Sequence, residues 1–121
     1  ASISLYSIVL IKWSIAIVQD RIQAGTRNSQ LYLLEAEAYL AMDLPLEARQ
    51  SFQQALALAE VNAELERQAD SYRGLGEIAA RQTEETTARE LFQKALALYE
   101  KLEDSEQTRY IQTELEQLDG Q

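Results

Sequence analysis

The segment EARQSFQQALALAE, residues 47–60, is followed 40 residues later by a second version of itself, TARELFQKALALYE at residues 87–100. Nine of the fourteen positions are identical in the two copies. Self-similarity at a period of roughly 20–50 residues is typical of proteins built from stacked structural repeats. The sequence therefore predicts a repeat architecture with one helix in each copy.

Small and large apolar residues recur in each copy at spacings of three and four, which places them on one face of a helix. Small residues let a second helix approach closely, and the phenylalanine fills the space that remains between the two helices. These faces consist of Ala48, Phe52, Ala55 and Leu56, and of Ala88, Phe92, Ala95 and Leu96. The second helix is expected upstream of each copy, carrying Tyr32, Leu34, Glu35, Ala36 and Tyr39 in one case and Tyr72, Leu75, Gly76 and Ala79 in the other.

These helix pairs resemble the tetratricopeptide repeat, a helix–turn–helix unit. Its first helix carries an aromatic residue, Leu-Gly and a tyrosine, and its second carries Ala, Phe and Ala. The matching residues are Tyr72, Leu75, Gly76, Ala88, Phe92 and Ala95 in the second unit and Tyr32, Tyr39, Ala48, Phe52 and Ala55 in the first. These are packing residues, so the resemblance, which covers roughly residues 29–118, indicates a fold rather than a partner.

Three features depart from the family pattern. Glu35-Ala36 replaces Leu-Gly, and Glu60 and Glu100 replace the usual proline at the end of the second helix. The 40-residue spacing also exceeds the usual period of about 34 residues. We expect longer helices or longer turns between the repeats to absorb the extra residues.

The expected fold class is all-α, a helical-repeat superhelix in a domain of residues 25–121, preceded by an apolar N-terminal helix within residues 1–24. Repeat one is expected at 29–61, with helices 29–42 and 45–61. Repeat two is expected at 63–102, with helices 63–81 and 84–102, and a capping helix at 105–118. Gly25 is expected to end the first helix. The residues expected to cap the later helices through their side chains are Asn28 or Ser29, Asn62, and Asp104 or Ser105. Gly74 and Gly76 should permit close approach of another helix.

Composition excludes several classes of function. The chain has no Cys and no His, which removes disulfides, thiolate metal sites and the commonest general base. It also lacks a Gly-rich phosphate loop and a metal-ligand cluster, so we expect no enzyme activity, no cofactor and no metal site. The net charge is −9; residues 1–23 contribute +1 and the remainder −10. This acidic body disfavours nucleic acid and favours neutral or basic protein partners.

Residues 2–18, SISLYSIVLIKWSIAIV, contain a single charge at Lys12, and twelve of the seventeen are apolar on all sides of a helix. A membrane anchor, a helix buried against the first repeat or in a subunit interface, and a β-strand of alternating residues are all compatible with this run. It is shorter than the roughly 20 residues that span a bilayer. The candidate membrane or interface residues are Ile8, Ile11, Trp13 and Ile17.

The expected cellular location depends on which of these alternatives holds for residues 2–18. In a membrane-anchored protein, Arg21 and Arg27 would favour repeats on the cytoplasmic side. Otherwise we expect a cytoplasmic protein.

The family resemblance implies that the first helices of stacked units line a concave surface that binds partners. The candidate partner-binding residues are Leu33, Glu37, Leu40, Arg73, Glu77, Ala80, Arg81, Tyr110 and Thr113. Arg73, Glu77 and Arg81 could equally form an exposed ladder of charge pairs along one helix. The Lys, Asn and Arg set with which the chaperone-binding branch grips a peptide carboxylate is absent, because Leu33 and Glu37 occupy its first-repeat positions.

The sequence thus favours a non-enzymatic adaptor or scaffold that binds a protein segment on its concave face. One alternative is a membrane-tethered subunit or assembly factor of a membrane complex, with residues 2–18 in or against the bilayer. Another is a fragment of a sensor array from a larger regulator. About three repeats are usually needed for stability, so two full repeats predict an oligomer or a larger complex.

Overall fold

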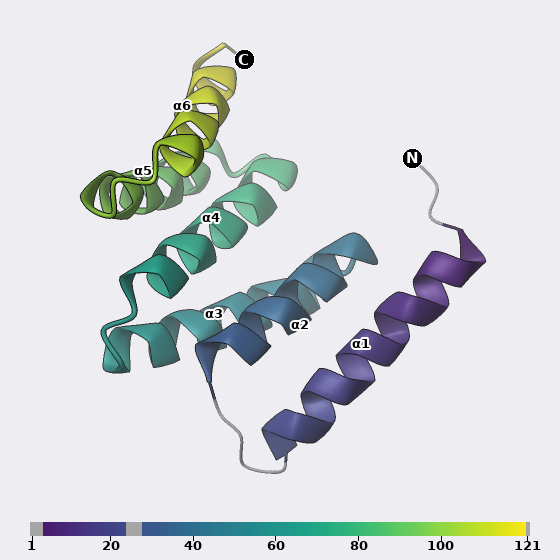
Figure 1. The fold of residues 1–121 in the computed structure, drawn as a ribbon. Coiled ribbons are helices and arrows are strands. Elements are labelled where there is room, and N and C mark those ends of the chain that lie inside the picture. Colours follow the sequence, from purple (N-terminus) through teal and green to yellow (C-terminus); the bar gives the residue numbers. More distant parts are fainter. Residues whose placement is uncertain (1–3, 24–27, 121) are drawn as a thin grey trace.

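The computed structural model describes residues 4–23 and 28–120 of the chain. Consecutive helices pack against one another in a stack, with α1 and α6 at its opposite ends (Figure 1). This arrangement confirms the all-α helical repeat. The helices are α1 (Leu5–Gln23), α2 (Ser29–Ala41), α3 (Pro45–Val61), α4 (Leu65–Arg81), α5 (Glu85–Lys101) and α6 (Ser105–Asp119).

A unit of 20 residues underlies the 40-residue period. Helices α3, α4 and α5 each have 17 residues, and three residues separate each from the next helix. The middle residue of each turn has a left-handed backbone, and the following N–H bonds to the carbonyl oxygen five residues earlier, as from Glu84 to Ala79 at 2.9 Å. The left-handed residues are Asp43, Ala63, Thr83 and Glu103, with φ of 56–59°. The extra length over the usual period therefore lies in the helices and not in the turns.

Two of the expected caps are present and one is wrong. The side chains of Asn28 and Asp104 accept hydrogen bonds from the first turns of α2 and α6, at 2.9 and 3.1 Å. Asn62 does not cap α4; it ends α3 instead. Because Ala63 adopts the left-handed conformation, α4 cannot begin at residue 63 and starts at Leu65. Gly25 lies outside the described residues.

The core consists of two apolar clusters centred on Phe52 and Phe92, which are 2% and 0% exposed. The predicted repeat-core residues Ala48, Ala55, Leu75, Gly76, Ala88 and Ala95 are buried as well. Tyr32 and Tyr39 pack half-buried against the Phe52 cluster, and Tyr72 packs against the Phe92 cluster. Glu35, which stands where the family has leucine, is buried and accepts a hydrogen bond from the Ser51 hydroxyl at 2.6 Å.

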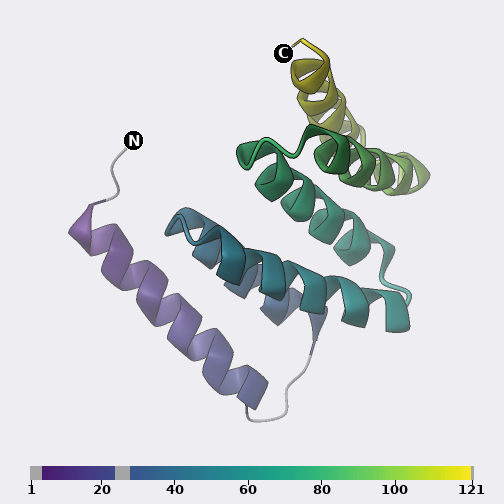
Figure 2. The same ribbon diagram turned by 180° about the vertical axis from the view of Figure 1, so that it is seen from behind.

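Two glycines let α4 pack against both of its neighbours. A Cβ at Gly74 would lie 2.3 Å from the Phe52 ring of α3, and a Cβ at Gly76 would lie 2.8 Å from the Phe92 ring of α5. Both views place α4 between these two helices (Figure 2). The close approach expected at Gly74 and Gly76 is therefore present, and each glycine accommodates a different phenylalanine.

The N-terminal run forms a helix, so the strand alternative is wrong. Helical spacing brings Ile8, Ile11, Ile15 and Val18 onto the side that faces α2, where Ile15 and Val18 are each 8% exposed. A strand would have split this set between two faces. The Gln19 side-chain amide donates to the Tyr39 hydroxyl at 2.8 Å and ties α1 to α2. Within residues 4–23 and 28–120, no helix meets the length and hydrophobicity that crossing a membrane requires.

Candidate functional site

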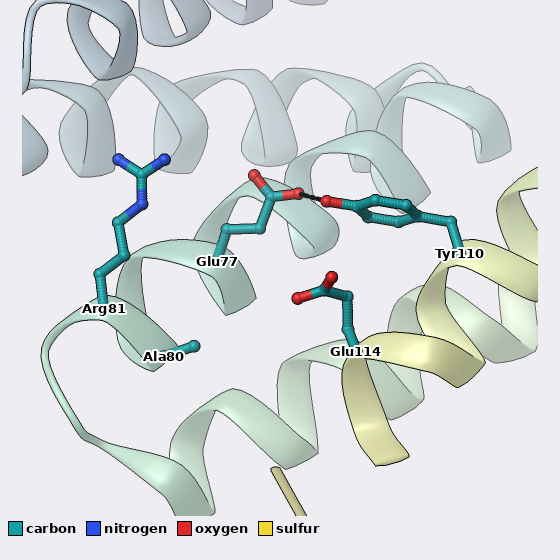
Figure 3. Close-up of a pocket in the computed structure, with 5 residues that line it drawn as sticks. All are labelled: Glu77, Ala80, Arg81, Tyr110 and Glu114. Carbon is teal, nitrogen blue, oxygen red and sulfur yellow. Dashed lines mark hydrogen bonds between the residues drawn. The ribbon is translucent and has the colours of Figure 1, made fainter. Parts of the chain in front are cut away.

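Two adjoining pockets lie between α4 and α6. One has a volume of about 330 Å³ and is lined by Arg73, Glu77, Glu106, Gln107 and Tyr110. The other has about 290 Å³ and is lined by Glu77, Ala80, Arg81, Tyr110 and Glu114. Figure 3 shows Glu77 and Tyr110 meeting across the second pocket, with the Glu114 carboxylate facing the same space. Five of the predicted partner-binding residues therefore come together here: Arg73, Glu77, Ala80, Arg81 and Tyr110.

Hydrogen bonds hold the walls of these pockets in place. The Tyr110 hydroxyl donates to Glu77 Oε1 at 2.9 Å, and Arg73 Nη1 donates to Gln107 Oε1 at 2.7 Å. Both bonds join α4 to α6. Arg73 also lies 3.8 Å from an Asp70 carboxylate oxygen and 4.0 Å from one of Glu77. The Arg73 guanidinium is thus shared between Gln107 and the carboxylates of Asp70 and Glu77, whose negative charge it partly offsets.

The Asp70 carboxylate is fixed from a third helix. It accepts a hydrogen bond from the hydroxyl of Tyr99, which is fully buried on α5. Burial and this hydrogen bond raise the pKa of the Tyr99 hydroxyl far above its ordinary value of 10. Tyr99 therefore stays protonated at neutral pH and donates to Asp70, which orients Asp70 toward Arg73.

Three glutamates from alternate helices form what we call the acidic row: Glu37 on α2, Glu77 on α4 and Glu114 on α6. Burial, and then the negative charge of Glu77, raise the pKa of the Glu114 carboxyl above 4.5. The pKa of Glu37 is also raised, first by burial and further by Asp70 and Glu77, although Arg73 opposes the shift. Both carboxylates are therefore partly desolvated and repelled by like charges.

An apolar groove of about 510 Å³ adjoins the row at the other end of the stack. It lies between α1 and α2 and is lined by Ser14, Ile17, Val18, Leu34, Glu37 and Ala38. Glu37 belongs to both features, because it lines the groove and interacts electrostatically with Arg73 and Glu77. The groove and the pockets consequently adjoin one surface that runs across α2, α4 and α6.

Of the other predicted partner-binding residues, Leu33 and Leu40 lie in or against the core, and Thr113 lines a further pocket beside Tyr110 and Glu114. Leu33 is 3% exposed within the Phe52 cluster, so its side chain is not available to a partner. Leu40 is half-buried against the same cluster. Thr113 is exposed on α6, and its hydroxyl donates to the Arg109 carbonyl oxygen at 3.0 Å. These positions lack the shared contacts that join Arg73, Glu77 and Tyr110.

Sequence reasoning missed Glu114, Gln107 and Asp70. Glu114 lies four residues after Tyr110, so helical spacing could have placed both on one side of the last helix. The repeat gave no help, because the position 40 residues earlier is Gly74. Gln107 and Asp70 contribute through contacts between helices, which no local pattern reports.

Metal binding finds no support in the described residues. Among them, no three His, Cys, Asp or Glu side chains are grouped in a way that could hold a metal ion.

The sequence matches the family model described as tetratricopeptide repeat over residues 28–101, which covers α2 to α5. No curated protein matched the sequence. The matched region is more than half of the chain and contains both of the 40-residue units. The chain therefore belongs to the tetratricopeptide repeat family.

Proposed function

We propose that this chain is a protein-interaction module whose acidic row binds a segment of another protein that carries lysine or arginine side chains. Repeats of this family generally mediate protein–protein interaction. The family alone does not define the partner, because the residues that match it are buried in the core. The partner's chemistry has to be inferred from the open surface of α2, α4 and α6.

The gathering of carboxylates on the open surface of α2, α4 and α6 carries this proposal, because Glu77, Glu106 and Glu114 line the two pockets and Glu37 lines the adjoining groove. The raised pKa values of Glu37 and Glu114 agree with it. A carboxylate that is desolvated and close to another carboxylate is stabilised when a cation binds beside it. Glu77 lies within electrostatic reach of both, so one cationic side chain near Glu77 would relieve repulsion at two positions. Charge-assisted hydrogen bonds of this kind are roughly twice as strong as neutral ones.

The dimensions of the surface agree with this chemistry. The two pockets of about 290 and 330 Å³ are at the lower end of the range for ligand pockets and have room for individual side chains. Their walls carry the carboxylates of Glu77, Glu106 and Glu114, the guanidinium groups of Arg73 and Arg81, and the Tyr110 ring. The carboxylates and the ring can bind a guanidinium through charge and ring stacking. With Glu37 of the adjoining groove, four carboxylates stand against two guanidinium groups, so this surface presents a net negative face to a partner.

A peptide selection tests the proposal. Random peptides displayed on phage are selected on the immobilised chain, and the enriched sequence is synthesised for fluorescence anisotropy. We expect enrichment of Lys or Arg and an affinity that falls as salt is raised, because exposed charge pairs are screened. Selected peptides without basic residues, or an affinity insensitive to salt, would refute the proposed chemistry.

Matched variants locate the binding site. Glu37→Gln/Glu114→Gln removes two charges from the row while leaving the Glu77–Tyr110 bond intact. Glu60→Gln/Glu90→Gln removes two exposed charges from α3 and α5. The first pair should weaken binding by about tenfold or more, the loss expected for one to two charge-assisted contacts. Equal losses in both pairs would mean that only overall charge matters and that the row is not the site.

A further inference from the structure

Helix α1 is apolar on two sides, and within residues 4–23 and 28–120 only the side that faces α2 is covered. The side facing α2 carries Ile15 and Val18, both buried. The opposite side carries six large apolar residues that are about half exposed or more in the described structure. These are Leu5, Tyr6, Val9, Leu10, Trp13 and Ile17, with exposures between 47% and 81%. We call this set the α1 stripe.

The α1 stripe is large for the surface of a monomer. An aromatic side chain presents roughly 150–250 Å² and an aliphatic one somewhat less, so the stripe amounts to an apolar patch on the order of 600–700 Å². The largest patch on a typical monomeric protein is about 300–600 Å². A standard protein–protein interface buries about 800 Å² on each partner, which the stripe and its immediate surroundings can supply.

The segment that contains α1 differs in net charge from the rest of the chain. Residues 1–23 carry Lys12, Asp20 and Arg21, a net charge of +1, whereas the remainder of the chain carries −10. Two copies that approach through their repeat surfaces would repel each other. Two copies that approach through α1 keep their acidic bodies on the outside of the pair.

We propose that two copies of this chain pair through the α1 stripe, with their α1 helices antiparallel about a two-fold axis. Figure 1 shows α1 at one end of the stack, with its long axis open on the side away from α2. An antiparallel pair centred near residue 11 sets Trp13 of one copy opposite Val9 of the other, and Leu5 opposite Ile17. The first of these contacts joins a larger with a smaller side chain and the second joins two aliphatic ones. The two-fold axis repeats each contact, as a closed dimer requires.

This interface leaves the two pockets of the acidic row open, because they lie between α4 and α6. The stripe and the row approach each other only at the groove between α1 and α2, which Ile17 and Glu37 both line. Pairing would join two binding surfaces in one particle, so a ligand with two basic segments would bind more tightly than one with a single segment.

The test is the mass of the full chain in solution, measured by sedimentation equilibrium and light scattering. We expect a particle of twice the 13.7 kDa chain mass that persists or strengthens at high salt, because its contacts are apolar and salt screens repulsion between the acidic bodies. A wild-type chain that stays monomeric up to about 100 µM, or that forms open-ended assemblies, would overturn the proposal.

A matched pair of variants distinguishes loss of the dimer interface from a folding defect. Trp13→Glu places a charge at the centre of the stripe, and Val61→Glu places the same charge at an 82% exposed apolar residue at the end of α3. Trp13→Glu should raise the dimer dissociation constant at least tenfold, with unchanged helical circular dichroism, and Val61→Glu should leave it unaltered. Equal effects of the two variants would show that the stripe is not the interface.

Discussion

Replacing Gly74 with alanine should destabilise this protein, although alanine is the better helix former. A Cβ at this position would lie 2.3, 2.4 and 2.6 Å from the Cζ, Cε1 and Cε2 atoms of Phe52. The Phe52 ring is 2% exposed and has little room to move. Overpacking of this kind costs about 1–3 kcal/mol, and the gain in helix propensity returns about 0.8–1 kcal/mol. Since three ring atoms would lie within 2.6 Å of the new Cβ, we expect the upper part of that cost, about 2–3 kcal/mol, and so a net loss of about 1–2 kcal/mol.

Two other glycines provide graded controls. A Cβ at Gly76 would lie 2.8 Å from two atoms of the Phe92 ring, so Gly76→Ala should cost less than Gly74→Ala. A Cβ at Gly120 would lie 3.6 Å from its nearest neighbour, the Glu116 carbonyl oxygen, which is an ordinary contact. Gly120→Ala should change the stability by no more than a few tenths of a kcal/mol.

Urea unfolding followed by circular dichroism gives the three free energies, provided that the m-value stays constant. The same series in a Phe52→Leu background completes a double-mutant cycle. Shortening the ring should relieve the clash, so Gly74→Ala should lose most of its cost there, while Gly76→Ala should not. If Gly74→Ala is as stable as the wild type in the Phe52 background, the phenylalanine is not seated against α4 and the packing between repeats is misplaced.

Three further predictions concern the turns, the tyrosines and the core. Thr83→Gly should stabilise the chain by about 1 kcal/mol, because a β-branched residue occupies a left-handed turn position (φ 58°). The control Thr87→Gly, within α5, should destabilise it by a few tenths of a kcal/mol. Thermal melts that rank the two variants the other way would contradict the turn geometry. Burial and the hydrogen bond to Glu77 raise the pKa of Tyr110 to about 12. Tyrosine in the unfolded chain loses its proton near pH 10. The contribution of Tyr110 to the free energy of unfolding should therefore be constant below pH 10 and should fall between about pH 10 and 12. Tyr110→Phe should make that decline shallower in melts across this range, and an unchanged slope would mean that the bond is absent in solution. Phe92→Ala should cost about 3–5 kcal/mol as a core cavity, and a loss of a few tenths in urea would show that the ring is not buried.

The periodic residues are the part of the fold that the sequence predicted well. Phe52 and Phe92, with the small residues around them, identify both helix pairs because helix packing depends on local spacing. Helix ends were less predictable. Asn62 has the side chain of a good cap, but the backbone bonds of the turn at Ala63 decide where α4 begins. Since Ala63 is not glycine, its left-handed conformation leaves no mark in the sequence.

The candidate site was predictable only where it follows the repeat. Arg73, Glu77 and Tyr110 were predicted from family positions and do come together. Leu33 occupies a matching position but is buried. Glu114 has no counterpart in the repeat, and its importance depends on how α6 is set against α4. The contacts between helices that set this arrangement connect residues about 30 positions apart, such as Arg73 and Gln107, and no pattern within one helix encodes them.

The central claim is that a basic segment binds across the acidic row. Nuclear magnetic resonance titration of the ¹⁵N-labelled chain with the selected peptide tests it residue by residue. We expect the largest amide shifts around Glu37, Glu77 and Glu114, with the Tyr110 environment changing at the same peptide concentration. Shifts that concentrate instead on the outer faces of α3 and α5 would contradict the assignment of the acidic row as the binding surface.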